Sequence, residues 1–268
     1  MQFPVEGFVA PGFERVREVF RDNFEHGAEV GASFSVQRAS EVLVDLWGGY
    51  QDRACTRPWL RDTLVNVYST GKGPAAAAVA AAVDDGKLDY DAPVRDYWPE
   101  LRAATGGLTV SQLLSHQAGL CGVDDTLAVT DLYDWSGMCR RLECQAPYWP
   151  PGTAAGFHAV TWGYLAGELV RRATGLSLGT LLRVRVAEPL GADFHIGLPA
   201  SEHYRVADLI GPNRARLPEP GREARPQLPP LNAVAMQNPS FDRSPTRAAA
   251  PGVAPRSRLP MVMAMPGG

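Results

Sequence analysis

The chain of 268 residues has an ordinary globular composition, with 45% hydrophobic residues, 21% charged residues and a formal net charge of −3. This composition allows a sizeable core and offers no basic surface of the kind that binds nucleic acid. No run approaches the ~18 consecutive apolar residues of a transmembrane helix, and no signal peptide is readable at the N-terminus. The four cysteines lack metal-ligand spacing. We therefore expect a cytoplasmic protein with no membrane segment, metal or other cofactor.

The first predicted elements are a helix and three strands. Residues 12–26 carry an apolar stripe and predict an amphipathic helix. Residues 32–38 and 41–47 are strand-like runs on either side of a short turn, which predicts an antiparallel hairpin. Residues 64–68 are apolar and β-branched, and they predict a further short strand.

Helices dominate the region that follows. Residues 75–83, which are almost all alanine, predict a helix with Ser69 as N-cap and Pro74 in its first turn. Further helices are expected at residues 109–114 with Thr109 as cap, at 161–174 and at 176–187. Strands followed by helices predict a mixed α/β sheet domain over residues 1–240, with a helical region over about 75–200.

The phrase Ser69-Thr70-Gly71-Lys72 carries the chemistry of the chain. On a helix Ser69 and Lys72 share one face, so a weak nucleophile lies beside a base that burial would hold partly neutral. This is the S-x-x-K arrangement of serine acyl-transfer enzymes, and its alternative is a helix cap beside a solvated lysine. A phosphate-binding P-loop is excluded, because Asn66 and Gly73 stand where that motif needs Gly and Ser or Thr.

Four further phrases accompany this motif in order: Gly86–Val94, Leu113–Leu120, Pro151–Thr153, and Phe157–Ala159 leading into Trp162–Glu168. Together the five phrases resemble the class C β-lactamase-like serine hydrolases, particularly the family VIII carboxylesterases. The resemblance covers roughly residues 10–240. It implies a β-lactamase/penicillin-binding-protein-like α/β fold, in which a mixed sheet domain and a helical domain enclose the active site.

The resemblance also implies a reaction. Ser69 would be acylated by a small-molecule ester while Lys72 takes its proton, and the Ser69 N–H would be one oxyanion donor. The other donor normally comes from a strand near the family's C-terminus. A β-lactam is an alternative substrate, and a DD-peptidase is disfavoured because no export signal is readable.

The chain departs from the family at the second catalytic motif, which normally begins with a tyrosine that serves with the lysine as general base. Phe157 stands at this position and has no group that moves a proton. A displaced motif would instead assign the phenol to Tyr148 or Tyr164. His158 either replaces the phenol or lines or caps the pocket. His116 could be a general base, but in the family it belongs to a structural loop, so we expect a packing and hydrogen-bonding role.

Three aromatic residues have two interpretations. Trp135, Tyr148 and Trp149 would line the mouth of the pocket if the helical region caps the site, and they are otherwise plain core residues. Phe157 and the missing third motif also support a rival function. In that interpretation the chain is a catalytically impaired or dead family member that only binds a ligand.

The residues after about 240 have a different character. From Arg243 onward no residue is acidic, and Met261, Met263 and Met265 lie close together. Methionine has a single codon, so reading this stretch one base out of frame forces Gly, Gly and Ala at these places, as in a segment of the related esterases. We predict that residues 241–268 are a disordered, out-of-frame tail and that the chain is C-terminally truncated. We then expect an incomplete sheet, poor solubility and little or no hydrolysis. Sequencing the gene across this region tests the prediction.

Overall fold

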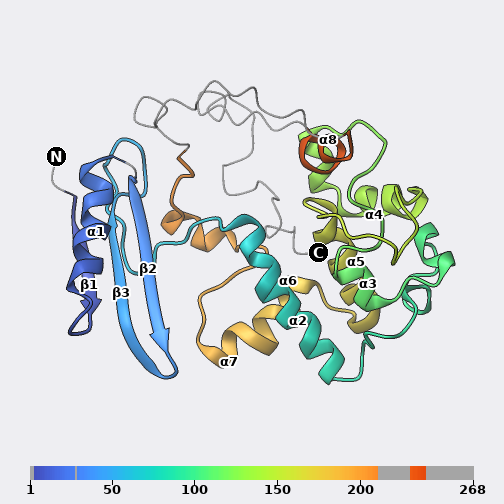
Figure 1. The fold of residues 1–268 in the computed structure, drawn as a ribbon, viewed down its shortest axis with the longest axis horizontal. Helices are drawn as coiled ribbons and strands as arrows, with labels where there is room; N and C mark the ends of the chain where they lie inside the picture. The colour runs from blue at the N-terminus through green and yellow to red at the C-terminus, as the bar shows by residue number, and fades with distance from the viewer. Residues whose placement is uncertain (1–2, 28, 211–229, 240–268) are drawn as a thin grey trace. The chain divides into compact units, whose positions relative to one another are not determined.

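A computed structural model describes residues 3–27, 29–210 and 230–239, which we call the described residues (Figure 1). They divide into two compact units. The sheet unit holds the described residues up to Asn66 together with residues 199–210, and the helical unit holds residues 67–198 and 230–239. The chain therefore leaves the sheet unit after Asn66 and returns to it at Pro199.

The sheet unit is a small antiparallel sheet covered by one helix. In the described residues its strands are β1 (Val5–Val9), β2 (Gly31–Arg38) and β3 (Glu41–Gly49), in the order β1-β3-β2. Helix α1 (Glu14–Glu25) lies along this sheet (Figure 1). Phe20 and Phe24 of α1 pack with Val44 and Leu46 of β3 in one buried cluster. The predicted helix and hairpin are confirmed.

Strand β1 has no counterpart among the sequence-based expectations. Glu6 and Gly7 interrupt its apolar pattern, so its alternation is weak. Gly7 has a φ of +105°, and a Cβ atom there would lie 2.0 Å from the carbonyl oxygen of Asp45 on β3. Glycine at this position is what allows β1 to approach β3 closely enough to pair.

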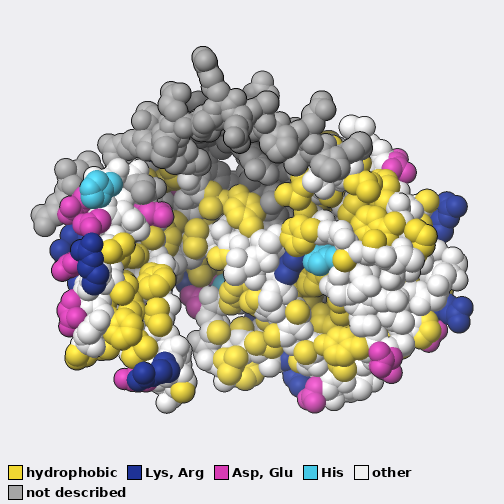
Figure 2. Space-filling view, in the orientation of Figure 1, with side chains coloured by type: hydrophobic (Ala, Val, Ile, Leu, Met, Phe, Trp, Pro, Cys, Tyr) yellow, Lys and Arg dark blue, Asp and Glu magenta, His cyan; other side chains and the backbone are white. Residues whose placement is uncertain are grey.

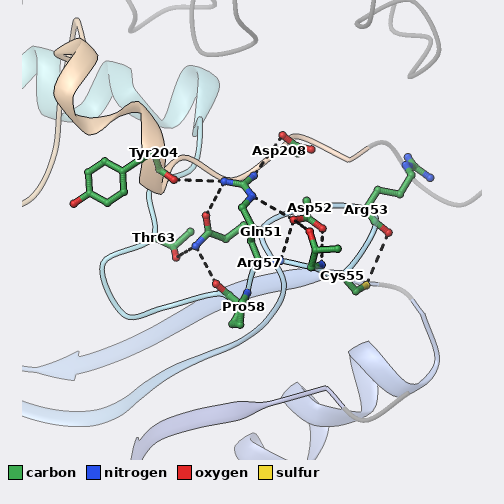
Figure 3. A network of polar contacts seen from close by, with 10 residues as sticks. Gln51, Asp52, Arg53, Cys55, Arg57, Pro58, Thr63, Tyr204 and Asp208 are labelled. Carbon is green, nitrogen blue, oxygen red and sulfur yellow. Dashed lines mark hydrogen bonds and ion pairs between the residues drawn. The ribbon is translucent and has the colours of Figure 1, made fainter.

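A polar network fastens the returning segment to the loop after β3 (Figure 3). Arg57 lies at its centre and donates to the Asp52 carboxylate and to Gln51 Oε1, both at 3.2 Å. The same guanidinium donates to the Tyr204 carbonyl at 3.4 Å and forms an ion pair with Asp208 at 3.8 Å. One arginine thus joins two segments of the sheet unit that are far apart in the sequence.

Residues 64–68 do not form the predicted strand. Leu64 makes one isolated parallel bridge with Val206, and no ladder follows it. The side chains of Val65 and Val67 stay exposed, and the chain then enters a 3-10 helix at Tyr68. The prediction is wrong because an apolar, β-branched run becomes a strand only where another strand pairs along its length.

The helical unit is assembled from short helices around one core. Its α-helices are α2 (Lys72–Asp84), α3 (Val110–Leu114), α4 (Trp135–Cys144), α5 (Thr161–Thr174), α6 (Leu178–Leu182), α7 (Glu188–Leu190) and α8 (Pro230–Gln237). Short 3-10 helices cover Tyr68–Gly71, Val94–Asp96, Arg102–Gly106 and Val129–Tyr133, and another covers Ala200–Arg205 in the sheet unit. Helices α3, α4 and α5 lie together in Figure 1.

Three helix predictions are confirmed. Helix α5 spans the predicted residues 161–174 and ends at Gly175, whose φ of +75° is the left-handed conformation typical of a helix C-terminus. Helix α3 begins after Thr109, whose hydroxyl accepts a hydrogen bond from the backbone N–H of Gln112 at 3.3 Å. Helix α2 contains the predicted residues 75–83, and the small side chains on one face are fully buried.

The prediction of one regular helix over residues 176–187 is wrong. Helix α6 begins two residues later, because the Ser177 hydroxyl caps it by accepting from the Thr180 N–H at 3.1 Å. The chain then widens into a π-helical turn over Arg183–Ala187 and continues through α7 to Gly191. The apolar periodicity of the sequence carries no signal for this change of helix type.

A buried carboxylate ties α5 to its neighbours. The side chain of Glu168 accepts hydrogen bonds from Trp135 Nε1 at 2.9 Å, Arg171 at 2.7 Å and Arg172 at 2.8 Å. Arg172 also pairs with Glu100 at 2.6 Å. Burial alone would raise the pKa of Glu168, but these hydrogen bonds outweigh burial and lower the pKa to about 2.

Hydrophobic side chains also reach the surface in several patches on the face that Figure 2 draws. Phe8 and Phe34 in the sheet unit and Leu190 in the helical unit are among the exposed apolar residues. All four cysteines are free thiols, of which Cys121 and Cys139 are buried. None of the helices in the described part of the chain is long and apolar enough to cross a bilayer. The predicted out-of-frame tail, residues 241–268, lies outside the described residues.

Candidate active site

Ser69 lies in the tight 3-10 turn directly before α2. The preceding residue, Tyr68, has a φ of +48°, in the left-handed region that residues with side chains rarely adopt. The prediction that Ser69 caps the helix is wrong, because α2 begins at Lys72 with Gly71 as its N-cap residue. The Ser69 hydroxyl instead accepts a hydrogen bond from Lys72 Nζ at 3.2 Å. The turn therefore sets the hydroxyl beside the amine.

The ammonium group of Lys72 is held from several sides. Nζ also donates to the Ala159 carbonyl at 3.1 Å, and it lies 4.9 Å from the ring centroid of Phe157 and 5.8 Å from that of Trp162. Burial lowers the pKa of Lys72 from its ordinary value of 10.5 to about 8. About a tenth of the molecules then carry a neutral amine at pH 7, and a neutral amine can accept a proton.

Phe157 is the exposed member of this group. The residue is 49% exposed, whereas His158 and Ala159 beside it are buried. The face of its ring attracts the Lys72 ammonium, but no atom of the ring gives or takes a proton. The structure thus brings Ser69, Lys72 and Phe157 together in one place.

His158 is 0% exposed, and backbone groups occupy both of its ring nitrogens. Nε2 accepts from the Leu120 N–H at 3.0 Å, so the proton of the neutral ring is on Nδ1, which donates to the Gly156 carbonyl. Burial lowers the pKa of His158 to about 4. Of the two roles that the sequence left open, these contacts support the structural one, because neither nitrogen is free to move a substrate proton.

The two tyrosines considered as substitutes for the missing phenol are engaged elsewhere. The Tyr148 hydroxyl donates to the Asp124 carboxylate at 2.7 Å. The Tyr164 hydroxyl donates to the Leu132 carbonyl at 2.6 Å, and the residue is buried in the core. Neither hydroxyl is hydrogen-bonded to Lys72 or Ser69, so neither tyrosine takes the place of Phe157 beside the lysine.

Trp149 packs against the segment that carries Phe157, whereas Trp135 donates a hydrogen bond to Glu168. The Trp149 indole donates to the Ala154 carbonyl at 2.8 Å and meets the His158 ring edge-on at 5.9 Å. Gly156 makes room for this indole, because a Cβ atom at residue 156 would come within 2.6 Å of it.

His116 is part of the same cluster, and its contacts match the packing and hydrogen-bonding role expected from the sequence. Its Nδ1 accepts from the His158 backbone N–H at 3.1 Å, and its ring centroid lies 5.0 Å from that of Phe157. Burial lowers the pKa of His116, and the positive charge of Lys72 lowers it further. No sequence signal could have shown this arrangement, since about 40 residues separate His116 from the segment it contacts.

The cluster supplies a hydroxyl nucleophile, an amine of lowered pKa and an apolar wall. Such a pair of side chains is suited to acyl transfer, in which the amine takes the hydroxyl proton as the oxygen attacks a carbonyl. The described residues contain no group of three or more His, Cys, Asp or Glu side chains placed to hold a metal ion.

The family described as Beta-lactamase matches residues 16–253, so the chain belongs to the beta-lactamase family. One relative, the esterase/beta-lactamase LipL of Mycobacterium tuberculosis (strain ATCC 25618 / H37Rv), is 37% identical over 211 residues, which are 78% of this chain and 49% of LipL. Another, the esterase EstB of Burkholderia gladioli, is 32% identical over 201 residues, covering 66% of this chain and 49% of EstB. The chain thus spans about half the length of these relatives.

Solved structures give the same result for the fold. A family VIII carboxylesterase superposes with a TM-score of 0.77 and 45% identity, over 89% of this chain and 62% of that one. A penicillin-binding protein homologue from Caulobacter crescentus superposes with a TM-score of 0.78 and 44% identity, over 90% of this chain and 64% of that one. The predicted family and fold class are confirmed.

Proposed function

We propose that the chain hydrolyses small esters through an acyl-Ser69 intermediate, with Lys72 as the base that accepts the Ser69 proton. The hydrogen bond of 3.2 Å between Lys72 Nζ and Ser69 Oγ carries this proposal, together with the lowered pKa of the lysine. Both LipL and EstB are named as esterases, and LipL is also named as a beta-lactamase, so an ester is the substrate that the two names share. The Ser69 backbone N–H would serve as one oxyanion donor.

A second candidate function is that of a catalytically impaired or dead family member that binds a ligand without turning it over. Phe157 favours it, because the side chain over Lys72 has no proton to exchange.

A fluorophosphonate probe separates the two candidates. The Ser69 oxygen attacks phosphorus and fluoride leaves, so a working nucleophile becomes covalently labelled. We expect labelling of the full chain at Ser69, shown by peptide mass spectrometry, and its loss in Ser69→Ala. Ser115→Ala, which changes an exposed serine of the same unit, serves as control and should label normally. An unlabelled wild-type chain would support the binding-only form.

The labelling rate should depend on pH through Lys72. The neutral amine is the base, so the rate should rise as the pH increases through about 8 and level off above it. Pseudo-first-order labelling rates between about pH 6 and pH 10 measure this profile. A rate that keeps rising toward the ordinary lysine value of 10.5 would show that Lys72 is not the depressed base.

Phe157→Tyr should increase the reactivity of Ser69. The new phenol would stand over Lys72, where the phenylalanine ring already lies 4.9 Å from Nζ, and would share the transfer of the serine proton. We expect the labelling and p-nitrophenyl acetate hydrolysis rates to rise roughly 10- to 100-fold, toward the usual contribution of a positioned acid–base group. Phe157→Leu, which adds no proton-transferring group, should give no increase. An unchanged rate in Phe157→Tyr would mean that the lysine alone is sufficient.

A further inference from the structure

Both sides of Phe157 are tied to a single residue, His116. The His116 carbonyl accepts from the Gly156 N–H at 3.0 Å, on the N-terminal side of Phe157. His116 Nδ1 accepts from the His158 N–H at 3.1 Å, on the C-terminal side. The imidazole ring fills the space between these two bonds and packs on the Phe157 ring at 5.0 Å. The segment over Lys72 is therefore attached to His116 at three points.

His116 makes these contacts at a conformational cost. Its φ is +66°, in the left-handed region that residues with a side chain rarely adopt because it strains the backbone. In that conformation the residue directs both its carbonyl and its ring toward residues 156–158. Strain of this kind persists where the surrounding contacts over-determine it, and here those contacts end at the segment that holds Lys72.

Ala159, which follows His158 in this segment, contacts Lys72 directly. The Ala159 carbonyl accepts from Lys72 Nζ at 3.1 Å, and Phe157 covers the same ammonium with its ring. Burial lowers the pKa of Lys72, and this segment supplies two of the groups that lie against the amine. If the segment were released, water would reach the amine and its pKa would rise toward the value of a solvated lysine.

We propose that His116 is a positioning residue for Lys72, which acts by fixing residues 156–159 over the amine. Its importance for turnover rests on the proposed function, but its effect on Lys72 does not. Because Nδ1 accepts from a backbone N–H, the neutral ring carries its proton on Nε2. His116 therefore serves as a fixed acceptor at Nδ1, and the proposal assigns it no proton transfer.

Two substitutions form a matched pair for the test. His116→Asn keeps an acceptor, since Oδ1 of asparagine replaces Nδ1, and asparagine tolerates a positive φ better than most residues. His116→Gly also accepts the positive φ, and it removes both the acceptor and the ring. Both variants thus allow the same backbone conformation, but only His116→Asn keeps an acceptor for the His158 N–H.

The measurement is the pKa of Lys72 in the full chain, from competitive acetylation with acetic anhydride between pH 6 and pH 11 and mass spectrometry of the Lys72 peptide. We expect wild type and His116→Asn to titrate near 8. Lys72 of His116→Gly should titrate at least one unit higher, so that it reacts about fivefold more slowly at pH 8. Lys87, an exposed lysine, is the internal reference.

The outcomes are distinct. An unchanged Lys72 pKa in His116→Gly would overturn the positioning role. A Lys72 pKa that is raised in His116→Gly but not in His116→Asn supports this role. It does so even where Ser69 never reacts with the fluorophosphonate probe. In that last case the proposed function fails while the inference about His116 stands. A shift of equal size in both variants would show that the ring fills space without acting as an acceptor, and would overturn the proposal.

Discussion

Lys72→Met is expected to slow the fluorophosphonate labelling of Ser69 by at least about 100-fold at pH 8, the lower end of what a positioned base contributes. Methionine nearly matches the length of lysine and fills the space between Phe157 and Trp162, but it takes no proton. Lys72→Arg should be equally slow, because a guanidinium stays protonated at this pH. The two variants together separate the loss of a base from the loss of a positive charge.

The control for Lys72 is Lys87→Met, which removes an exposed lysine from the loop after α2 and should label at the wild-type rate. Labelling rates are measured at fixed probe concentration, and circular dichroism spectra are compared to establish that each variant is folded. Wild-type labelling of Lys72→Met would contradict the assignment of the base.

Glu168→Gln is expected to lower the free energy of unfolding by about 1–3 kcal/mol, the usual cost of losing charged hydrogen bonds at a buried side chain. The carboxylate is 4% exposed and pairs with Arg171 and Arg172. The substitution leaves the charge of both arginines without its buried partner. Urea unfolding followed by tryptophan fluorescence measures the change.

Glu100→Gln is the matched control, because it breaks another ion pair of the same Arg172. The Glu100 side chain is 55% exposed, so its loss should cost less than about 1 kcal/mol. Equal destabilisation by both substitutions would mean that burial of Glu168 does not decide the effect.

Glu168 should also make the stability of the fold sensitive to acid. The pKa of Glu168 is about 2 in the folded chain against an ordinary value of 4.5. Its contribution to stability is therefore fully present above pH 4.5 and is lost as the pH falls toward 2. Glu168→Gln should flatten the decline in stability over this range.

Local signals in the sequence were sufficient for several elements of the fold. The amphipathic pattern of α1 and the cap at Thr109 act within one or two turns of chain, so the sequence shows them directly. Residues 64–68 were mispredicted, because whether an apolar run pairs depends on a distant neighbour, here Val206. Strand β1 depends in the same way on the close approach of Gly7 to Asp45.

The residues of the candidate site also differ in whether local sequence signals predict their roles. Ser69 and Lys72 lie three residues apart, so the spacing itself predicts that hydroxyl and amine meet. The roles of His158 and His116 depend on backbone groups about 40 residues away in the sequence. Spacing offers no means of choosing between a proton-transferring and a structural histidine, whereas the hydrogen-bond partners do.

The Arg57 network has a consequence for the order in which the chain folds on the ribosome. Gln51 and Asp52 are synthesised just before Arg57, but Tyr204 and Asp208 emerge only after residues 67–198 have been made. At ~5–20 residues per second this is a wait on the order of ten seconds. The helical unit can complete most of its folding during this interval, while the sheet unit stays open until its last segment arrives.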